Sequence, residues 1–220
     1  MINRNPSTTI LSAVAVWLLT ACAEIVYTPY DATVDAVNPL AREVRFEVAR
    51  TFYADPPDCV TVLPVEGSSD FAAAETIEET LARHLGGRVP KVIGPAERRR
   101  NERSAGIDLT SVEGRHIFAA ATRCRFFLKT TMDQLRNDYA FVWSGRSVGL
   151  SLELVPASGG GATWRATHVA SRGEGGLPLS PFSLVAGAFQ AGQFQSDADA
   201  LPSILDDAAR RMMATLPDMR

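Results

Sequence analysis

The chain has 220 residues, of which 46% are hydrophobic and 21% are charged, and its formal net charge at pH 7 is −3. This length fits one domain of ordinary size with room for a real core. The slight acidic excess gives no overall field that would attract nucleic acid, so we expect no nucleic acid partner.

The first 21 residues have the order of features of a secretory signal peptide. A short polar start that contains Arg4 precedes an apolar run over residues 10–19, and the small residues Thr20 and Ala21 follow. The run is too short to cross a membrane as a helix. We therefore predict a signal peptide over residues 1–21.

The tetrapeptide Leu19-Thr20-Ala21-Cys22 resembles the lipobox of bacterial lipoproteins. The resemblance implies that Cys22 is acylated, becomes the first residue after cleavage and is acylated again on its amino group. Several acyl chains, worth about 0.8 kcal/mol per buried methylene, hold a protein on a membrane almost permanently. Ala23 stands where an aspartate commonly retains such proteins at the inner membrane, which favours the periplasmic face of the outer membrane. The alternative is an ordinary signal peptide that a cysteine follows by chance.

Prolines punctuate the polar and aromatic sequence that follows Cys22. We therefore predict a lipidated tether over residues 22–57 and a folded periplasmic domain over residues 58–217. Within the tether, a short strand over residues 41–52 is a further expectation. It is based on the alternating apolar residues Val44, Phe46 and Val48.

The first half of the predicted domain alternates strands and helices. Residues 59–65 are β-branched and nearly all apolar, which is typical of a strand buried on both faces of a sheet. Ser68 or Ser69 can cap a helix over residues 70–85, and a second strand follows over residues 88–93. The helix face expected to pack on the sheet consists of Phe71, Ala74, Ile77, Leu81 and Leu85.

Two more helices and a third strand are predicted next. Pro95 suits the first turn of a helix over residues 96–104, and residues 111–121 form an amphipathic stretch. The third strand is predicted over residues 123–132. The apolar side of the amphipathic stretch consists of Val112, Ile117, Phe118 and Ala121.

The second half of the domain is predicted to form hairpins. Residues 147–155 alternate apolar and polar, residues 157–161 form a glycine-rich turn, and residues 163–171 return as the next strand. The apolar segment 177–189 is expected to dock on the sheet, contact another subunit or dip into the membrane. A terminal helix over residues 200–216 covers the sheet with an apolar stripe of Leu201, Ile204, Leu205, Ala208, Met212 and Leu216.

These elements define an α/β (α+β) fold class. The predicted sheet is mixed, with a βαβ first half, an antiparallel hairpin second half and packed helices.

Two local motifs extend the resemblance beyond the lipobox. The first predicted strand ends in Val-Leu-Pro-Val at residues 62–65, and the hairpin turn leads to Gly161-Ala162-Thr163-Trp164. Together with the lipobox, they resemble the envelope lipoproteins related to the TolB amino-terminal domain and CsgG, which include PelC-like and uncharacterised lipoproteins. The chain departs from these relatives at Thr122-Arg123, where most carry an alanine-aspartate pair. The resemblance implies an assembly or secretion accessory that acts by binding protein partners or further copies of itself.

The resemblance also bears on Cys59 and Cys124. In the related fold, the strands that these two residues open are neighbours, which implies that the side chains can approach each other. A disulfide persists in the oxidising envelope, whereas the alternative is two buried thiols that behave as small apolar residues. Both alternatives remain open at this point.

An arginine cluster lies in the helix predicted over residues 96–104. It consists of Arg98, Arg99, Arg100 and Arg103. Such a cluster can hold an anionic polymer, a lipid headgroup or an acidic protein surface. The favoured alternative is a solvated helix face that Glu97 and Glu102 balance.

The sequence carries no recognisable catalytic, metal-binding or phosphate-binding motif. The three histidines, His84, His116 and His168, are dispersed and have no carboxylate or cysteine at ligand spacing. We therefore expect no enzymatic activity, no catalytic residue, no metal and no cofactor.

The leading functional hypothesis is a non-enzymatic outer-membrane lipoprotein that serves as a scaffold or accessory in export, secretion or envelope assembly. The alternative is a lipoprotein that binds a small ligand or a polysaccharide. That alternative needs an aromatic cleft, for which the candidates are Tyr139, Phe141, Trp143 and Trp164.

Overall fold

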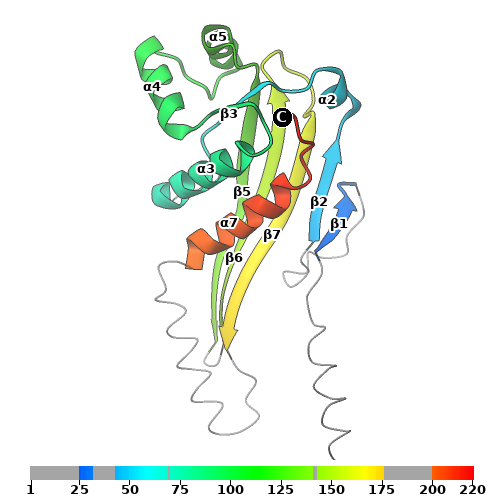
Figure 1. Ribbon diagram of the computed structural model, residues 1–220. Helices are drawn as coiled ribbons and strands as arrows, with labels where there is room; N and C mark the ends of the chain where they lie inside the picture. The colour runs from blue at the N-terminus through cyan, green and yellow to red at the C-terminus, as the bar shows by residue number, and fades with distance from the viewer. Residues whose placement is uncertain (1–24, 32–42, 69, 141–142, 176–199) are drawn as a thin grey trace, which may run out of the picture.

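The computed structural model describes residues 25–31, 43–68, 70–140, 143–175 and 200–220, which are built around one mixed sheet (Figure 1). The sheet has seven strands in the order β1-β2-β7-β6-β5-β3-β4. The strands are β1 (Val26–Pro29), β2 (Glu43–Val48), β3 (Cys59–Val62), β4 (Lys91–Ile93), β5 (Phe126–Ala140), β6 (Trp143–Pro156) and β7 (Trp164–Gly175). The helices are α2 (Arg50–Ala54), α3 (Phe71–Leu85), α4 (Pro95–Ala105), α5 (Val112–Thr122) and α7 (Ala200–Met213).

The topology confirms the predicted fold class. β3 is parallel to both β4 and β5, and α3 connects β3 to β4, so the first half is a βαβ unit. β5, β6 and β7 are antiparallel neighbours joined as hairpins, as the second-half pattern predicts.

The folded part begins before Cys59, which corrects the predicted boundary between tether and domain. β2 pairs antiparallel with β7, and β1 pairs parallel with β2. Of the strand expected over residues 41–52, the part Glu43–Val48 is present as β2, whereas residues 50–52 belong to α2, and Val44 of β2 is fully buried. β1 has only four residues. It is held in the sheet by pairing with β2 and has no apolar pattern of its own.

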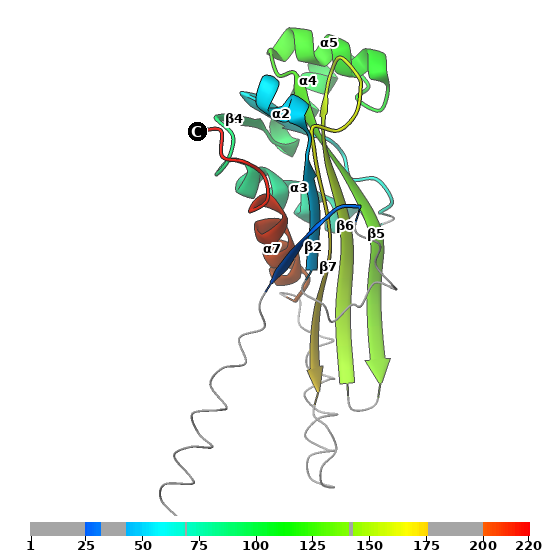
Figure 2. The ribbon, with the colours of Figure 1, turned by 90° about the vertical axis from the view of Figure 1, so that its right-hand side faces the viewer.

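One face of the sheet carries the main core, which α3 and α7 cover (Figures 1 and 2). Val148, Leu150, Leu152 and Leu154 of β6 are all buried there because alternate strand residues point to one face. The predicted stripe of α7 is confirmed where its side chains are described, at Ile204, Leu205, Ala208 and Met212, and Leu216 is buried just after the helix, which ends at Met213 and not at residue 216.

Two details of α3 differ from the prediction. Asp70 caps the helix by accepting hydrogen bonds from the amides of Ala72 and Ala73, whereas Ser68 is not the cap. Helical spacing places Phe71 on the packed face, but its exposure is 77%. As the first residue of the helix, it lies beyond the end of the buried stripe that Ile77, Leu81 and Leu85 form.

The second face of the sheet has a smaller core beneath α5. Phe118 of α5 packs against Phe127 of β5, with ring centroids 6.3 Å apart. Of the predicted apolar side of α5, only Phe118 is buried, whereas Val112, Ile117 and Ala121 are exposed. At Gly114 the helix lies against the backbone of Asp108, so closely that a Cβ atom would meet the Asp108 carbonyl oxygen at 1.8 Å.

The three hairpin strands are longer than predicted. β5 and β6 pair continuously from Phe126↔Pro156 to Ala140↔Trp143, with an irregularity between Met132 and Gln134. The paired strands project past α3 and α7 at one end of the sheet (Figure 2). Their polar sequence hides this extension from a pattern search, because the pairing continues after the apolar alternation ends.

The apolar segment 177–189 lies outside the described residues. Within the described ranges, none of the helices combines the length and hydropathy needed to cross a membrane.

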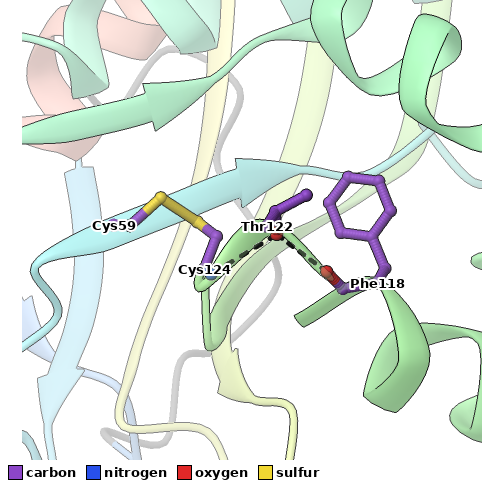
Figure 3. Close-up of a disulfide and its surroundings, with 4 residues drawn as sticks. All are labelled: Cys59, Phe118, Thr122 and Cys124. Carbon is purple, nitrogen blue, oxygen red and sulfur yellow. Dashed lines mark hydrogen bonds between the residues drawn. A yellow bond between two sulfur atoms is a disulfide. The ribbon is translucent and has the colours of Figure 1, made fainter. Parts of the chain in front are cut away.

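Cys59 and Cys124 form a disulfide with a Cα–Cα distance of 5.0 Å (Figure 3). Cys59 opens β3, and Cys124 lies in the connection between α5 and β5. Thr122 holds this connection: its hydroxyl donates to the Phe118 carbonyl at 2.8 Å and accepts from the Cys124 amide at 3.4 Å. The sequence left a disulfide and two free thiols open as alternatives, and the structure contains the disulfide.

We predict that replacing both Cys59 and Cys124 by serine lowers the free energy of unfolding. The bridge closes a loop with a sequence separation of 65, for which the chain-entropy model gives about 4 kcal/mol. Urea unfolding of the Cys22→Ser protein and of the triple serine variant measures the difference. A reducing agent should lower the first stability to that of the second, and equal stabilities without it would contradict the prediction.

Candidate functional site

The structure separates the arginine cluster into buried and exposed members. Arg98 is only 3% exposed, so the prediction of an anion-binding or solvated position is wrong for this residue. Its guanidinium pairs with the Glu78 carboxylate at 2.9 Å and donates to the Val62 carbonyl at 2.6 Å. The burial of Arg98 therefore depends on the carboxylate of Glu78, which lies 20 residues away in the sequence.

The other arginines of the cluster differ in pairing and exposure. Arg99 pairs with Glu75 at 2.8 Å, whereas Arg100 and Arg103 are exposed. The predicted balancing of arginine charge by Glu102 is present in part, because the Glu102 carboxylate lies 3.6 Å from the guanidinium of Arg98. The four arginines therefore do not form a common anion surface.

The buried ion pair fixes the backbone where β3 ends. Arg98 binds the carbonyl of Val62, the last residue of β3, and Glu78 accepts a hydrogen bond from the Val65 amide at 3.2 Å. The next residue, Glu66, forms a parallel bridge with Thr131 of β5. The ion pair therefore holds an extended segment, residues 63–66, beside β5.

A groove of about 610 Å³ lies along this segment, and we call it the β3-end groove. The segment 63–66, the start of α5, β5, β6 and the glycine turn after β6 form its walls. Its apolar lining includes Leu63, Val65, Leu109, Val112 and Val155, and its charged lining consists of Glu66, Arg115, Lys129 and Glu153.

The charges of the β3-end groove are partly used by the protein itself. Lys129 lies 3.4 Å from Glu66, and Arg115 donates to the carbonyls of Leu109 and Thr110 at 3.0 Å each. Beside the groove, hydrogen bonds from Thr110 lower the pKa of Asp108. The mixed lining suits reversible binding of a small polar molecule with an apolar part.

A second hollow of about 580 Å³ lies near the disulfide. Its lining includes Asp55, Asp58, His116, Arg123 and Arg125. Arg125 makes two hydrogen bonds to the Asp55 carboxylate, at 3.1 and 3.2 Å. Both partners are more than half exposed, so this pair adds little stability.

The three histidines belong to three different elements, His84 to α3, His116 to α5 and His168 to β7. His84, in the last turn of α3, pairs with Asp206 of α7 at 2.8 Å. His168 is buried, and its Nδ1 atom lies 2.7 Å from the Glu43 carbonyl oxygen. Burial lowers the pKa of His168. Among the described residues, no group of three or more histidine, cysteine and carboxylate side chains could hold a metal ion.

The aromatic cleft proposed for ligand binding is not formed by Trp164. This side chain is 1% exposed in the main core, where its indole nitrogen donates to Thr215 at 3.2 Å. Trp164 pairs with Leu154 of β6, eleven residues from Trp143, which places the tryptophans about 36 Å apart along the strands. The side chains of Tyr139, Phe141 and Trp143 lie outside the described part of the structure.

Cys22 also lies outside the described residues, so its acylation stays a prediction. In the sequence, however, Cys22 lies only a few residues before the first strand, since β1 starts at Val26.

No family model and no curated protein matches this chain. Solved structures that it resembles include the PelC dodecamer from Paraburkholderia phytofirmans, with 19% identity over 72% of this chain and 95% of that chain and a TM-score of 0.41. Lipoprotein GNA1162 from Neisseria meningitidis has 15% identity over 64% of this chain and 100% of that chain, with a TM-score of 0.46. A minor lipoprotein from Acinetobacter baumannii has 10% identity over 74% of this chain and 96% of that chain, with a TM-score of 0.38. At TM-scores this low, neither function nor assembly state is transferred from these proteins.

We predict that breaking the buried ion pair destabilises the protein more than removing it. Arg98→Met or Glu78→Leu alone leaves an unpaired buried charge, which costs about 3–5 kcal/mol, whereas the double variant should recover most of the loss. Urea unfolding of the three variants measures the coupling. Arg100→Met is the matched control and should change stability by less than about 0.5 kcal/mol, because Arg100 is exposed. Additive losses in the double variant would contradict the prediction.

Proposed function

We propose that this protein is a lipoprotein anchored at the periplasmic face of the outer membrane and acts there as a non-enzymatic scaffold or accessory in export or envelope assembly. The observation that carries the proposal is Leu19-Thr20-Ala21-Cys22 directly after the apolar run of residues 10–19. This order supplies both an export signal and an acylation site.

The cysteines support this location. The chain has three cysteines, and the disulfide uses Cys59 and Cys124, which leaves Cys22 as the one thiol for lipid. A disulfide of this kind persists in an oxidising compartment such as the periplasm. Both uses of cysteine therefore favour the cell envelope.

A scaffolding role is supported by surfaces that suit contact with other proteins. Phe71 places a large aromatic side chain at the surface at the start of α3, with an exposure of 77%. Beyond the area that α5 covers, the second sheet face is polar, and the hydroxyls of Ser151 and Thr167 lie 3.0 Å apart. We nominate no nucleophile and base, so the proposed action is binding alone.

We predict that labelled palmitate enters the wild-type protein and does not enter the Cys22→Ser variant. Cys22 is the only cysteine outside the disulfide, so no other thiol can take the label. Autoradiography of the purified proteins measures incorporation. The double variant Cys59→Ser/Cys124→Ser is the matched control and should keep the label. Equal labelling of wild type and Cys22→Ser would end the proposal.

The second candidate function is binding of a small ligand, and the β3-end groove favours it. Its volume of about 610 Å³ lies in the range of small-molecule sites, and its apolar walls are combined with the charged groups of Lys129 and Glu153. A periplasmic lipoprotein with this activity would use the anchor for location and the groove for capture.

Light scattering of the Cys22→Ser protein separates the two candidates. For the scaffold, we predict a discrete assembly with a mass several times that of one chain, because a scaffold acts through protein contacts. A monomer that binds an anionic sugar, and binds it at least tenfold more weakly after Lys129→Ala, would favour ligand capture. Arg100→Ala is the matched control, since Arg100 does not line the groove.

A further inference from the structure

Arg123 adopts a backbone conformation that glycine usually occupies. It directly follows the last residue of α5 and has φ 58° and ψ 27°, in the left-handed region. Among the described residues, it is the only one other than glycine with a positive φ. α4 ends in the same conformation, but there the residue is Gly106, with φ 64° and ψ 34°. The left-handed conformation is costly for a residue with a Cβ atom, so glycine would suit the end of α5 better.

The chain on both sides of Arg123 holds it in this conformation (Figure 3). On one side, the Thr122 hydroxyl donates to the Phe118 carbonyl and accepts from the Cys124 amide. On the other side, the disulfide fixes Cys124 to Cys59. Strained residues that their surroundings fix so firmly cluster at functional sites. The arginine side chain is therefore a candidate for a functional group.

Arg123 lines the second hollow, whose volume is about 580 Å³. His116, Ala119 and Ala120 line it as well, and their spacing places all four residues on one face of the chain at α5. The two alanine side chains are small, so they leave an apolar space between His116 and Arg123. The rest of the apolar lining consists of Phe126, Pro156 and Ala157.

The charged groups of the second hollow divide into a paired and an unpaired set. Arg125 and Asp55 bind each other through two hydrogen bonds. Arg123 and Asp58 also line the hollow, but their side chains have no ion pair or hydrogen bond with the part of the chain that the structure describes. Each of these two residues directly precedes one cysteine of the disulfide, which fixes the spacing of their backbones. The hollow therefore holds one unpaired cation and one unpaired anion.

We propose that the second hollow binds a small zwitterion of the amino acid and short peptide class. The planar guanidinium of Arg123 binds the carboxylate, and the carboxylate of Asp58 binds the ammonium group. An apolar side chain of the ligand packs against Ala119 and Ala120, and the volume lies in the range of small-molecule sites. A simple anion fits less well because Asp58 repels it. The inference goes beyond the proposed function, since it needs neither the lipid anchor nor the β3-end groove.

Calorimetric titration of the purified full chain tests this site. The probes are L-leucine and the dipeptide alanyl-leucine, and the one that binds more tightly identifies an amino acid site or a peptide site. Acetylation of the amino group or amidation of the carboxyl group of that probe should each weaken binding at least tenfold, because each removes one charge. If neither leucine nor alanyl-leucine binds at about 10 mM, the proposal is overturned.

Two variants assign the charged groups of the ligand. In Asp58→Asn, acetylation of the probe should no longer weaken binding, and in Arg123→Met, amidation should no longer weaken it. Arg103→Met is the matched control and should bind the probe as the wild type does, because Arg103 is exposed and does not line the hollow. Blocking groups that weaken binding equally in the variants and the wild type would overturn the assignment of both residues.

The variant Arg123→Gly separates binding from folding. Glycine adopts the left-handed conformation without a steric cost, so the Tm of this variant should be equal to or higher than that of the wild type. Its affinity for the probe should nevertheless fall at least tenfold. A lower Tm would show that Arg123 serves the fold, and unchanged affinity would show that it does not hold the ligand, so either result overturns the proposal. Neither result bears on the lipid anchor, which palmitate labelling tests separately.

Discussion

The alternation of side chains along β6 is the constraint on which the rest of the structure depends. Val148, Leu150, Leu152 and Leu154 are all buried on one face, where α3 and α7 pack. A shift of one residue in the pairing of β6 would turn all four toward the second face. The register with β5 and β7 is therefore held by the larger of the two apolar cores that the described residues form. The same register sets the positions of β2, of β1 and of the last described pair of the hairpin, Ala140↔Trp143.

The Arg98–Glu78 pair has a different role from that of the apolar core. Burying two charges brings little net stability, but the pair also binds the backbone at Val62 and Val65. It therefore specifies where the chain runs after β3 ends. The β3-end groove exists because segment 63–66 is held beside β5 and does not collapse onto the helices.

Much of the fold could be predicted from local patterns, because alternation and helical stripes survive in the second-half strands and in α7. Features that depend on distant partners could not. Arg98 is buried because it pairs with Glu78, and β1 is a strand because it pairs with β2. The β5–β6 pairing continues past Met132 without an apolar pattern to indicate it. For the candidate sites, the sequence nominates Cys22 and offers the Cys59–Cys124 bridge as one of two alternatives, but it misses the β3-end groove, whose walls come from four separate stretches of the chain.

Under the proposed export, the disulfide has a consequence for oxidative folding. Three cysteines allow three pairs, and Cys59 emerges closer in sequence to Cys22 than to its native partner Cys124. A free Cys22 would compete for Cys59 before the second half of the chain arrives. With Cys22 acylated as proposed, a single pairing is left, so attachment to the membrane would also protect the chain from scrambled crosslinks.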